Sequence, residues 1–226
     1  MRAPTRSLPR VVVLISGAGT NLHAIIQHQR DGRLPLHLCA VVCNRPSATG
    51  LSHAHHAKIP TRIIDHTCYS TREAFDNALQ TAIDTYDPDL VVLAGFLRIL
   101  TAGFVQHYHG RLLNIHPSLL PRYPGLHTHQ AALDSGDQEH GATVHFVTDE
   151  LDGGPRVLQA RVKINPADTA QSLASRVLQC EHQIYPLVIK WFTQGRLRLS
   201  PQGVTLDGQI LADVLQFDPN DPKYNY

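Results

Sequence analysis

Two polar side chains at the end of an apolar run are the first candidates for chemistry. The run Leu112-Leu113-Asn114-Ile115-His116 is typical of a β-strand, and the loop after it is stiffened by prolines at positions 117, 121 and 124. Strand alternation puts Asn114 and His116 on one face. In open α/β sheets ligands bind beyond the carboxyl ends of strands, so this amide and imidazole suit oxyanion and acid–base chemistry. For the pair by itself, the favoured interpretation is structural: Asn114 caps a neighbouring segment and His116 is a strand-end histidine with satisfied hydrogen bonds.

A carboxylate follows a later strand. The segment 142–147 leads into Thr148-Asp149-Glu150-Leu151-Asp152-Gly153-Gly154. This acidic loop lacks the spacing of a calcium loop, and on its own it also fits a solvated turn. Together with Asn114 and His116, however, Asp152 completes a set of side chains that can stabilise charge and move protons.

A glycine-containing turn provides a third signal. The apolar run Val11–Ile15 passes through Ser16-Gly17-Ala18-Gly19-Thr20-Asn21 into a helical pattern. Glycines let backbone N–H groups approach an anion, and the start of a helix adds the positive end of its dipole. The turn has neither the Lys-Ser/Thr ending of a nucleoside-triphosphate loop nor the third glycine of a dinucleotide loop. A single phosphate monoester is the simplest ligand, although a tight turn without ligand has the same form.

Alternating strands and helices must position these groups. Several short runs, notably Val11–Ile15 and Leu90–Ala94, are apolar at every position, which is typical of parallel strands covered on both faces. We therefore expect an α/β fold with a mainly parallel central sheet and helices on both faces. The other expected strands are 36–42, 61–64, 112–115, 143–147 and 157–164, and the expected helices are 21–30, 71–86, 101–108, 127–135 and 168–193.

The 226 residues suit one domain, since no linker or repeat divides them. We expect this domain to span residues 1–200 and a C-terminal extension to span residues 201–226. Residues 205–211 contain an Asp-Gly pair that is typical of a small hairpin turn. The polar tail after them is expected to be an appendage.

The composition argues against nucleic acid and membranes as partners. The formal net charge of +1 gives no field for nucleic acid, and no apolar run is long enough to span a bilayer. The four cysteines lack CxxC spacing, so we expect reduced thiols, Cys39 and Cys43 in the core, and a cytoplasmic location. His53 and His56 are spaced like metal ligands on a possible helix, but no carboxylate or cysteine stands at ligand spacing. We expect no metal.

Read together, three stretches strongly resemble the phosphoribosylglycinamide formyltransferases, which use 10-formyltetrahydrofolate. They are Leu-Ile-Ser-Gly-x-Gly-x-Asn-Leu, Asn-Ile-His-Pro-Ser-Leu-Leu-Pro-x-Tyr-Pro-Gly-Leu-His-Thr-His and His-Phe-Val-Thr-Asp-Glu-Leu-Asp-Gly-Gly-Pro. The resemblance runs from about Val11 to about Arg198. It implies a Rossmann-like sheet and formyl transfer from 10-formyltetrahydrofolate to the amine of 5-phosphoribosylglycinamide in purine (IMP) synthesis, without metal. It further implies that Asn114 and His116 support the oxyanion and proton transfer, and that Asp152 tunes His116.

The resemblance assigns further positions by match. It implies a ribonucleotide site at Gly19, Thr20, Asn21 and Glu181. The implied folate site comprises Arg72, Leu97, Arg98, Ile99, Leu100 and Asn114, with residues 149–154 around the pterin and His127 as a supporting residue. Ala18 departs from the family, where a polar residue is common, which puts a side-chain contact to phosphate in doubt. The implied partners are the two small molecules, and the chain is expected to be a monomer or homodimer.

Other functions remain open at this point. A formyltetrahydrofolate hydrolase would use the same Asn-His-Asp centre with water as acceptor, but it would not need the phosphate loop. A methionyl-tRNA formyltransferase is disfavoured by the near-neutral charge. A noncatalytic sensor of a phosphorylated metabolite would be expected to have lost one of the central residues, yet all three are present.

Overall fold

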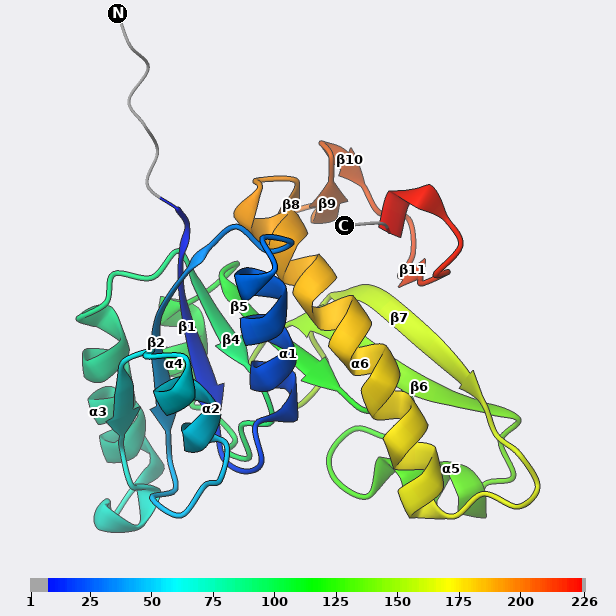
Figure 1. The fold of residues 1–226 in the computed structure, drawn as a ribbon, viewed down its shortest axis with the longest axis horizontal. Coiled ribbons are helices and arrows are strands. Elements are labelled where there is room, and N and C mark those ends of the chain that lie inside the picture. Colours follow the sequence, from blue (N-terminus) through cyan, green and yellow to red (C-terminus); the bar gives the residue numbers. More distant parts are fainter. Residues whose placement is uncertain (1–7, 225–226) are drawn as a thin grey trace, which may run out of the picture.

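Strands and helices alternate through most of the chain (Figure 1). The computed structural model describes residues 8–224. The strands are β1 (Arg10–Ile15), β2 (His37–Cys43), β3 (Thr61–Ile63), β4 (Leu90–Leu93), β5 (Leu112–His116), β6 (Glu139–Phe146), β7 (Arg156–Lys163), β8 (Leu197–Ser200), β9 (Gly203–Leu206), β10 (Gln209–Ile210) and β11 (Leu215–Gln216). The α-helices are α1 (Thr20–Arg30), α2 (Leu51–His56), α3 (Arg72–Asp84), α4 (Ala102–His107), α5 (Thr128–Asp134) and α6 (Ala170–Thr193), and two short 3-10 helices span His66–Cys68 and Pro222–Tyr224.

The main sheet has eight strands in the order β11-β7-β6-β5-β4-β1-β2-β3. Strands β1 to β5 pair in parallel, whereas β6 runs antiparallel to both β5 and β7. The predicted α/β fold with a mainly parallel sheet is confirmed. The antiparallel strand matters for the site, because it brings residues of β6 directly opposite those of β5.

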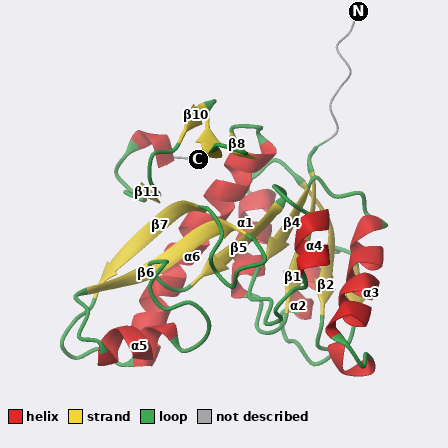
Figure 2. Cartoon of the chain, turned by 180° about the vertical axis from the view of Figure 1, so that it is seen from behind, coloured by secondary structure: helices red, strands yellow, loops and turns green. Residues whose placement is uncertain are grey.

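Helices cover both faces of the sheet, as the two opposite views show (Figures 1 and 2). In β1, Val11, Val13 and Ile15 belong to the apolar cluster that contains buried residues of α1 and α6. Val12 and Leu14 belong to the cluster formed with α3 and α4. Every residue from Val11 to Ile15 is fully buried, which explains why this run is apolar at each position.

Helix α6 is tied to the strands that carry the site. Its Tyr185 is fully buried, and the hydroxyl lies 2.9 Å from the carbonyl oxygen of Leu93 and 3.0 Å from that of Leu113. These carbonyls lie on adjacent strands, where Leu93 at the end of β4 pairs with Asn114 of β5. The hydroxyl therefore provides a hydrogen-bond donor to these buried carbonyls, one of which directly precedes Asn114.

The C-terminal segment packs against the main body. Strands β8, β9 and β10 form a small antiparallel sheet, with Asp207 and Gly208 at the β9–β10 turn. The tail after it, expected to be an appendage, contributes β11, which pairs in parallel with β7. Tyr224 is only 4% exposed, and its ring centroid lies 6.1 Å from that of Trp191 in α6. Apolar contacts thus hold a tail that is mostly polar in sequence.

Candidate active site

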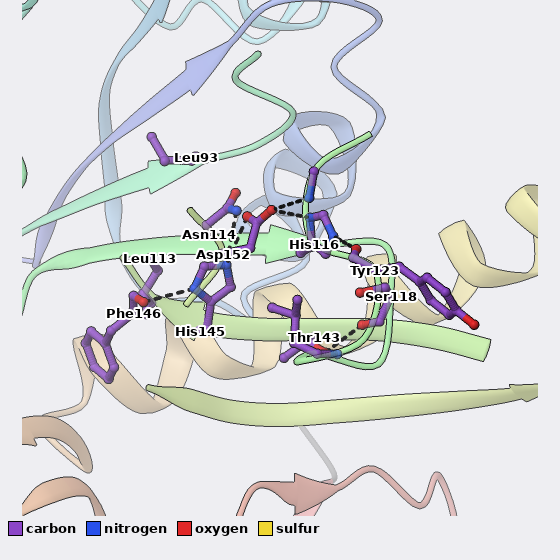
Figure 3. A network of polar contacts seen from close by, with 12 residues as sticks. Leu93, Leu113, Asn114, His116, Ser118, Tyr123, Thr143, His145, Phe146 and Asp152 are labelled. Atoms are coloured by element: carbon purple, nitrogen blue, oxygen red, sulfur yellow. Dashed lines mark hydrogen bonds and ion pairs between the residues drawn. The ribbon is translucent and has the colours of Figure 1, made fainter. Parts of the chain in front are cut away.

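Asn114 and His116 lie on the same face of β5, opposite the core residues Leu113 and Ile115. The β5–β6 register places Asn114 opposite His145. Asn114 is half-buried and His116 is only 5% exposed. The expected one-face arrangement of the amide and imidazole is therefore present, with a second imidazole added beside it (Figure 3).

Asp152 reaches this face from the β6–β7 loop and lies between Asn114 and His116 in Figure 3. Its Oδ2 is 3.4 Å from His116 Nδ1 and accepts a 2.8 Å hydrogen bond from the Gly125 N–H. The loop passes close to β6 at Gly154. A Cβ at this position would lie 1.9 Å from the Phe146 carbonyl oxygen, so no larger residue fits without a shift of the backbone. The structure thus brings together the three predicted central residues.

His116 faces oxygen atoms on both sides of its ring. Nδ1 faces Asp152, and Nε2 lies 2.8 Å from the backbone carbonyl of Tyr123. Tyr123 and Gly125 belong to the loop between β5 and α5, so this loop contacts both His116 and Asp152. The backbone of the loop, as well as the polar side chains, therefore sets the geometry of the centre.

His145 completes the cluster and was not predicted from the sequence. Nδ1 lies 2.9 Å from the Phe146 carbonyl oxygen and Nε2 lies 3.2 Å from Asn114 Nδ2. Burial is the main cause that lowers the pKa of His145 to about 4, so the ring is neutral at pH 7. Because a carbonyl only accepts, Nδ1 carries the proton and Nε2 accepts from the Asn114 amide. The sequence signals for it were its place in the strand before Asp152 and its position at the start of the stretch His-Phe-Val-Thr-Asp-Glu-Leu-Asp-Gly-Gly-Pro.

The predicted phosphate loop joins β1 to α1. Gly19 has φ of 69°, in the left-handed region, and no side chain caps the start of α1. The Gly50 N–H donates to the Gly17 carbonyl oxygen at 2.9 Å, and a Cβ at Gly19 would lie 2.9 Å from the Gly50 Cα. Glycine is therefore required at Gly19 both by conformation and by the close approach of α2. The uncapped helix start can accept an anion.

Asn21 and Glu181, both predicted for the ribonucleotide site, are in direct contact. Asn21 Nδ2 donates to Glu181 Oε2 at 2.6 Å, although 160 residues separate them. Burial raises the pKa of Glu181 to about 7, and the hydrogen bond from Asn21 partly opposes this shift. Asn21 Oδ1 is buried and has no hydrogen-bond partner. This arrangement leaves polar groups available next to the phosphate loop.

Apart from Asn114 and the 149–154 loop, the predicted folate residues lie on α3 and on the β4–α4 loop. Leu97, Arg98, Ile99 and Leu100 form the loop between β4 and α4, in which Leu97 is 53% and Ile99 is 52% exposed. The Arg98 guanidinium lies 5.8 Å from the centroid of the Phe75 ring in α3. Arg72 is exposed in the first turn of the same helix.

The phosphate loop and the β4–α4 loop are connected by Ser16. Its hydroxyl donates to Asn44 Oδ1 at 2.6 Å and accepts from the Leu97 N–H at 2.8 Å. His127, predicted as a supporting residue, is exposed at the N-cap of α5 with φ of 60°. Its proposed support for the centre stays a prediction, as do the individual roles of the folate residues.

Within the described range, no helix has the length and apolar character needed to cross a bilayer. Among the same residues, no group of three or more histidine, cysteine, aspartate and glutamate side chains is placed to hold a metal ion.

The chain is similar to known formyltransferases over most of its length. The formyl transferase family model matches residues 9–189. Phosphoribosylglycinamide formyltransferase of Escherichia coli is 54% identical over 201 residues, covering 89% of this chain and 95% of the relative. The human trifunctional purine biosynthetic protein adenosine-3 is 41% identical over 194 residues, which are 86% of this chain and 19% of that larger protein.

The chain is also similar to a solved structure of a phosphoribosylglycinamide formyltransferase. The phosphoribosylglycinamide formyltransferase of Coxiella burnetii is 51% identical and has a TM-score of 0.90, with 94% of this chain and 100% of that chain covered. The chain therefore belongs to the formyl transferase family and, within it, to the phosphoribosylglycinamide formyltransferases.

Proposed function

We propose that this enzyme transfers a formyl group from 10-formyltetrahydrofolate to the amine of 5-phosphoribosylglycinamide in purine synthesis, and that Asn114, His116 and Asp152 carry out the chemistry. Family membership supports the reaction. The observation that carries the assignment of residues is the meeting of an amide and an imidazole from β5 with a carboxylate from the β6–β7 loop. These residue types serve a reaction in which the substrate amine is itself the nucleophile.

The reaction requires charge stabilisation and proton movement. The amine nitrogen attacks the formyl carbon, and the carbonyl oxygen becomes an oxyanion. Collapse of this tetrahedral species breaks the bond to the donor nitrogen, which gains a proton, while the attacking nitrogen loses one. A preorganised N–H donor stabilises the oxyanion more in the transition state than in the ground state.

Asn114 is the first such donor. One of its two amide hydrogens is held by His145 Nε2, so the second is directed elsewhere. The half-buried position of Asn114 leaves this hydrogen available to the oxyanion. His145 thereby acts as a positioning residue, since it fixes which end of the Asn114 side chain is the nitrogen.

His116 is the second donor and the proton carrier. Both of its nitrogens face oxygen acceptors, an arrangement that suits the two N–H groups of an imidazolium. Asp152 stabilises that charged form and is itself held by the Gly125 N–H. The Tyr123 carbonyl occupies Nε2, so transfer through that nitrogen requires movement of the β5–α5 loop, whereas Nδ1 remains paired with Asp152.

The acceptor substrate binds along α1 and α6 in this proposal. Its phosphate meets the uncapped start of α1 at Gly19, Thr20 and Asn21. Glu181 contacts the glycinamide portion, and its pKa of about 7 makes its charge responsive to a neighbouring ammonium group. An ammonium placed there would favour the carboxylate form.

The formyl donor binds on the other side of the centre. Leu97 and Ile99 are exposed in the β4–α4 loop. Their apolar side chains provide a surface that suits a flat pterin ring. Leu151, which is 52% exposed, precedes Asp152 in the β6–β7 loop that is proposed to surround the pterin. Arg72 and Arg98 supply positive charge for the carboxylates of the donor's tail. Location in the cytoplasm and a monomeric or homodimeric state stay predictions.

A spectrophotometric assay tests the proposed function. The purified protein is given a 10-formylfolate donor, with and without 5-phosphoribosylglycinamide, and without added metal. Product formation should require the ribonucleotide. Loss of the formyl group at the same rate without it would identify a hydrolase, and inactivity under both conditions would contradict enzymatic transfer.

A further inference from the structure

Two imidazoles lie beside the phosphate loop. His23 is in the first part of α1 and His53 is in α2, and their ring centroids are 4.7 Å apart with planes inclined by 47°. The Gly50–Gly17 hydrogen bond brings the start of α2 to the loop. His53 also has a polar contact with the backbone of Ala18, inside the loop. The two rings therefore flank the same loop from different helices.

The segments around the phosphate loop contain few side chains that could carry a positive charge. Residues 16–23, helix α2 and residues 178–182 of α6 contain histidine but neither lysine nor arginine. A phosphate monoester carries close to two negative charges near neutral pH, whereas a helix start provides only partial positive charge. In these segments, imidazoles are the side chains that can supply a full positive charge.

We propose that His23 and His53 take up a proton when the phosphate monoester of the ribonucleotide enters the loop, and that they bind it as a protonated imidazole pair. This inference rests on the proposed function, which supplies the phosphate-bearing substrate. It adds a pH-dependent recognition element that Ala18, with its methyl side chain, does not provide.

The groups around His53 favour its neutral form in the free protein. Burial first, and then His23 and His56, lower the pKa of His53, while the contact with the Ala18 backbone opposes this shift. From α6, His182 has a pKa lowered by burial and by His23. No acidic residue lies in the first turn of α1, and Glu181 of α6 is paired with Asn21. A bound phosphate adds the missing negative charge and favours protonation.

Calorimetric titration with ribose 5-phosphate and with 5-phosphoribosylglycinamide tests the pair. Because binding takes up a proton, both dissociation constants should rise about tenfold from about pH 6.5 to about pH 8.5, the scale of one charge-assisted hydrogen bond. The measured heat should also change with the ionisation enthalpy of the buffer. Affinity that is constant over this range, with no proton uptake, would overturn the proposal.

Variants separate the two histidines from the rest of the site. His53→Gln should weaken binding of ribose 5-phosphate about tenfold near pH 6.5 and flatten its pH dependence. His53→Arg should retain the affinity but lose the pH dependence, because its charge is permanent. His55→Gln is the matched control, since His55 lies on the same helix with Nε2 3.2 Å from Thr61 Oγ1.

The outcome is independent of formyl transfer. Ribose 5-phosphate has no amine to formylate, so its binding reports on the phosphate site even if the proposed reaction fails. Unchanged binding by His53→Gln in a protein that still transfers the formyl group would reject the histidine pair and leave the proposed function in place. If His53→Gln does not fold, the pH titration of the natural protein and His53→Arg still decide the question.

Discussion

The orientations of the polar side chains at the centre are set by their hydrogen-bond and ion-pair partners as well as by their positions on the strands. Asn114 is held by His145, and His145 is held in turn by the Phe146 carbonyl. His116 is held between Asp152 and the Tyr123 carbonyl. An amide held in one orientation, as Asn114 is, reaches the transition state with little reorganisation.

His145 gives the sharpest residue-scale prediction. His145→Phe should lower kcat about ten- to a hundredfold, because Asn114 would lose the acceptor that orients its amide. His145→Gln should recover part of this loss, since its side-chain oxygen can accept from Asn114. Steady-state kinetics with both substrates provide the measurement.

The KM values decide whether His145 acts by positioning. They should change little in both variants, because neither substrate is proposed to contact His145. An equal loss in both variants, or a rise in KM without a change in kcat, would contradict the positioning role.

The same residues show what sequence could reveal at this scale. Asn114, His116 and Asp152 were predicted because their types, their strand-end positions and their family motifs agreed. His145 was missed because its significance depends on pairing with Asn114 across an antiparallel register. The residues that surround His145 in its strand do not indicate that partner.

At the scale of elements, the phosphate loop depends on contact between its turn and α2. Gly19→Ala should lower the free energy of unfolding by about 1–3 kcal/mol, because a side chain there is both strained and in conflict with Gly50. Gly17→Ala is the matched control. A Cβ at Gly17 would meet nothing within 4 Å, and its backbone is outside the left-handed region.

Denaturant unfolding of both glycine variants checks this prediction. The control should stay within about 0.5 kcal/mol of the natural protein. Equal stability of the two variants would show that the close approach of α2 does not constrain the turn.

The elements differ in how far sequence could predict them. Strand β1 was predictable because burial on both faces requires apolar side chains throughout Val11–Ile15. Strand β11 has only Leu215 and Gln216, and no periodic pattern can emerge from two residues. Its existence depends on pairing with β7, which is a tertiary contact.

At the scale of the molecule, one sheet gathers segments that lie far apart in the chain. The phosphate loop follows β1, the proposed folate loop follows β4, the central amide and imidazole lie on β5, and Glu181 comes from α6. Ser16 links the first two loops, and Tyr185 links α6 to β4 and β5. Under the proposed function, loops from separate strands would bring the two substrates to the centre on β5.

The C-terminal tail packs against α6 and pairs with β7. Tyr224 packs near Trp191 and Phe217, and its hydroxyl donates to the Gln216 carbonyl oxygen at 2.6 Å. This packing was not predictable from a largely polar tail, because it depends on a contact between Tyr224 and Trp191 of α6, which lies far away in the sequence. The boundary between residues 200 and 201 stays a prediction.

The turnover of His116→Ala tests the central claim most directly. With saturating donor and ribonucleotide, the variant should turn over at least about a hundredfold more slowly than the natural protein, the scale of one lost acid–base group. Its affinity for the ribonucleotide should change only modestly, because the phosphate loop is intact. Near-normal turnover by a folded His116→Ala protein would contradict the assignment of this centre to formyl transfer.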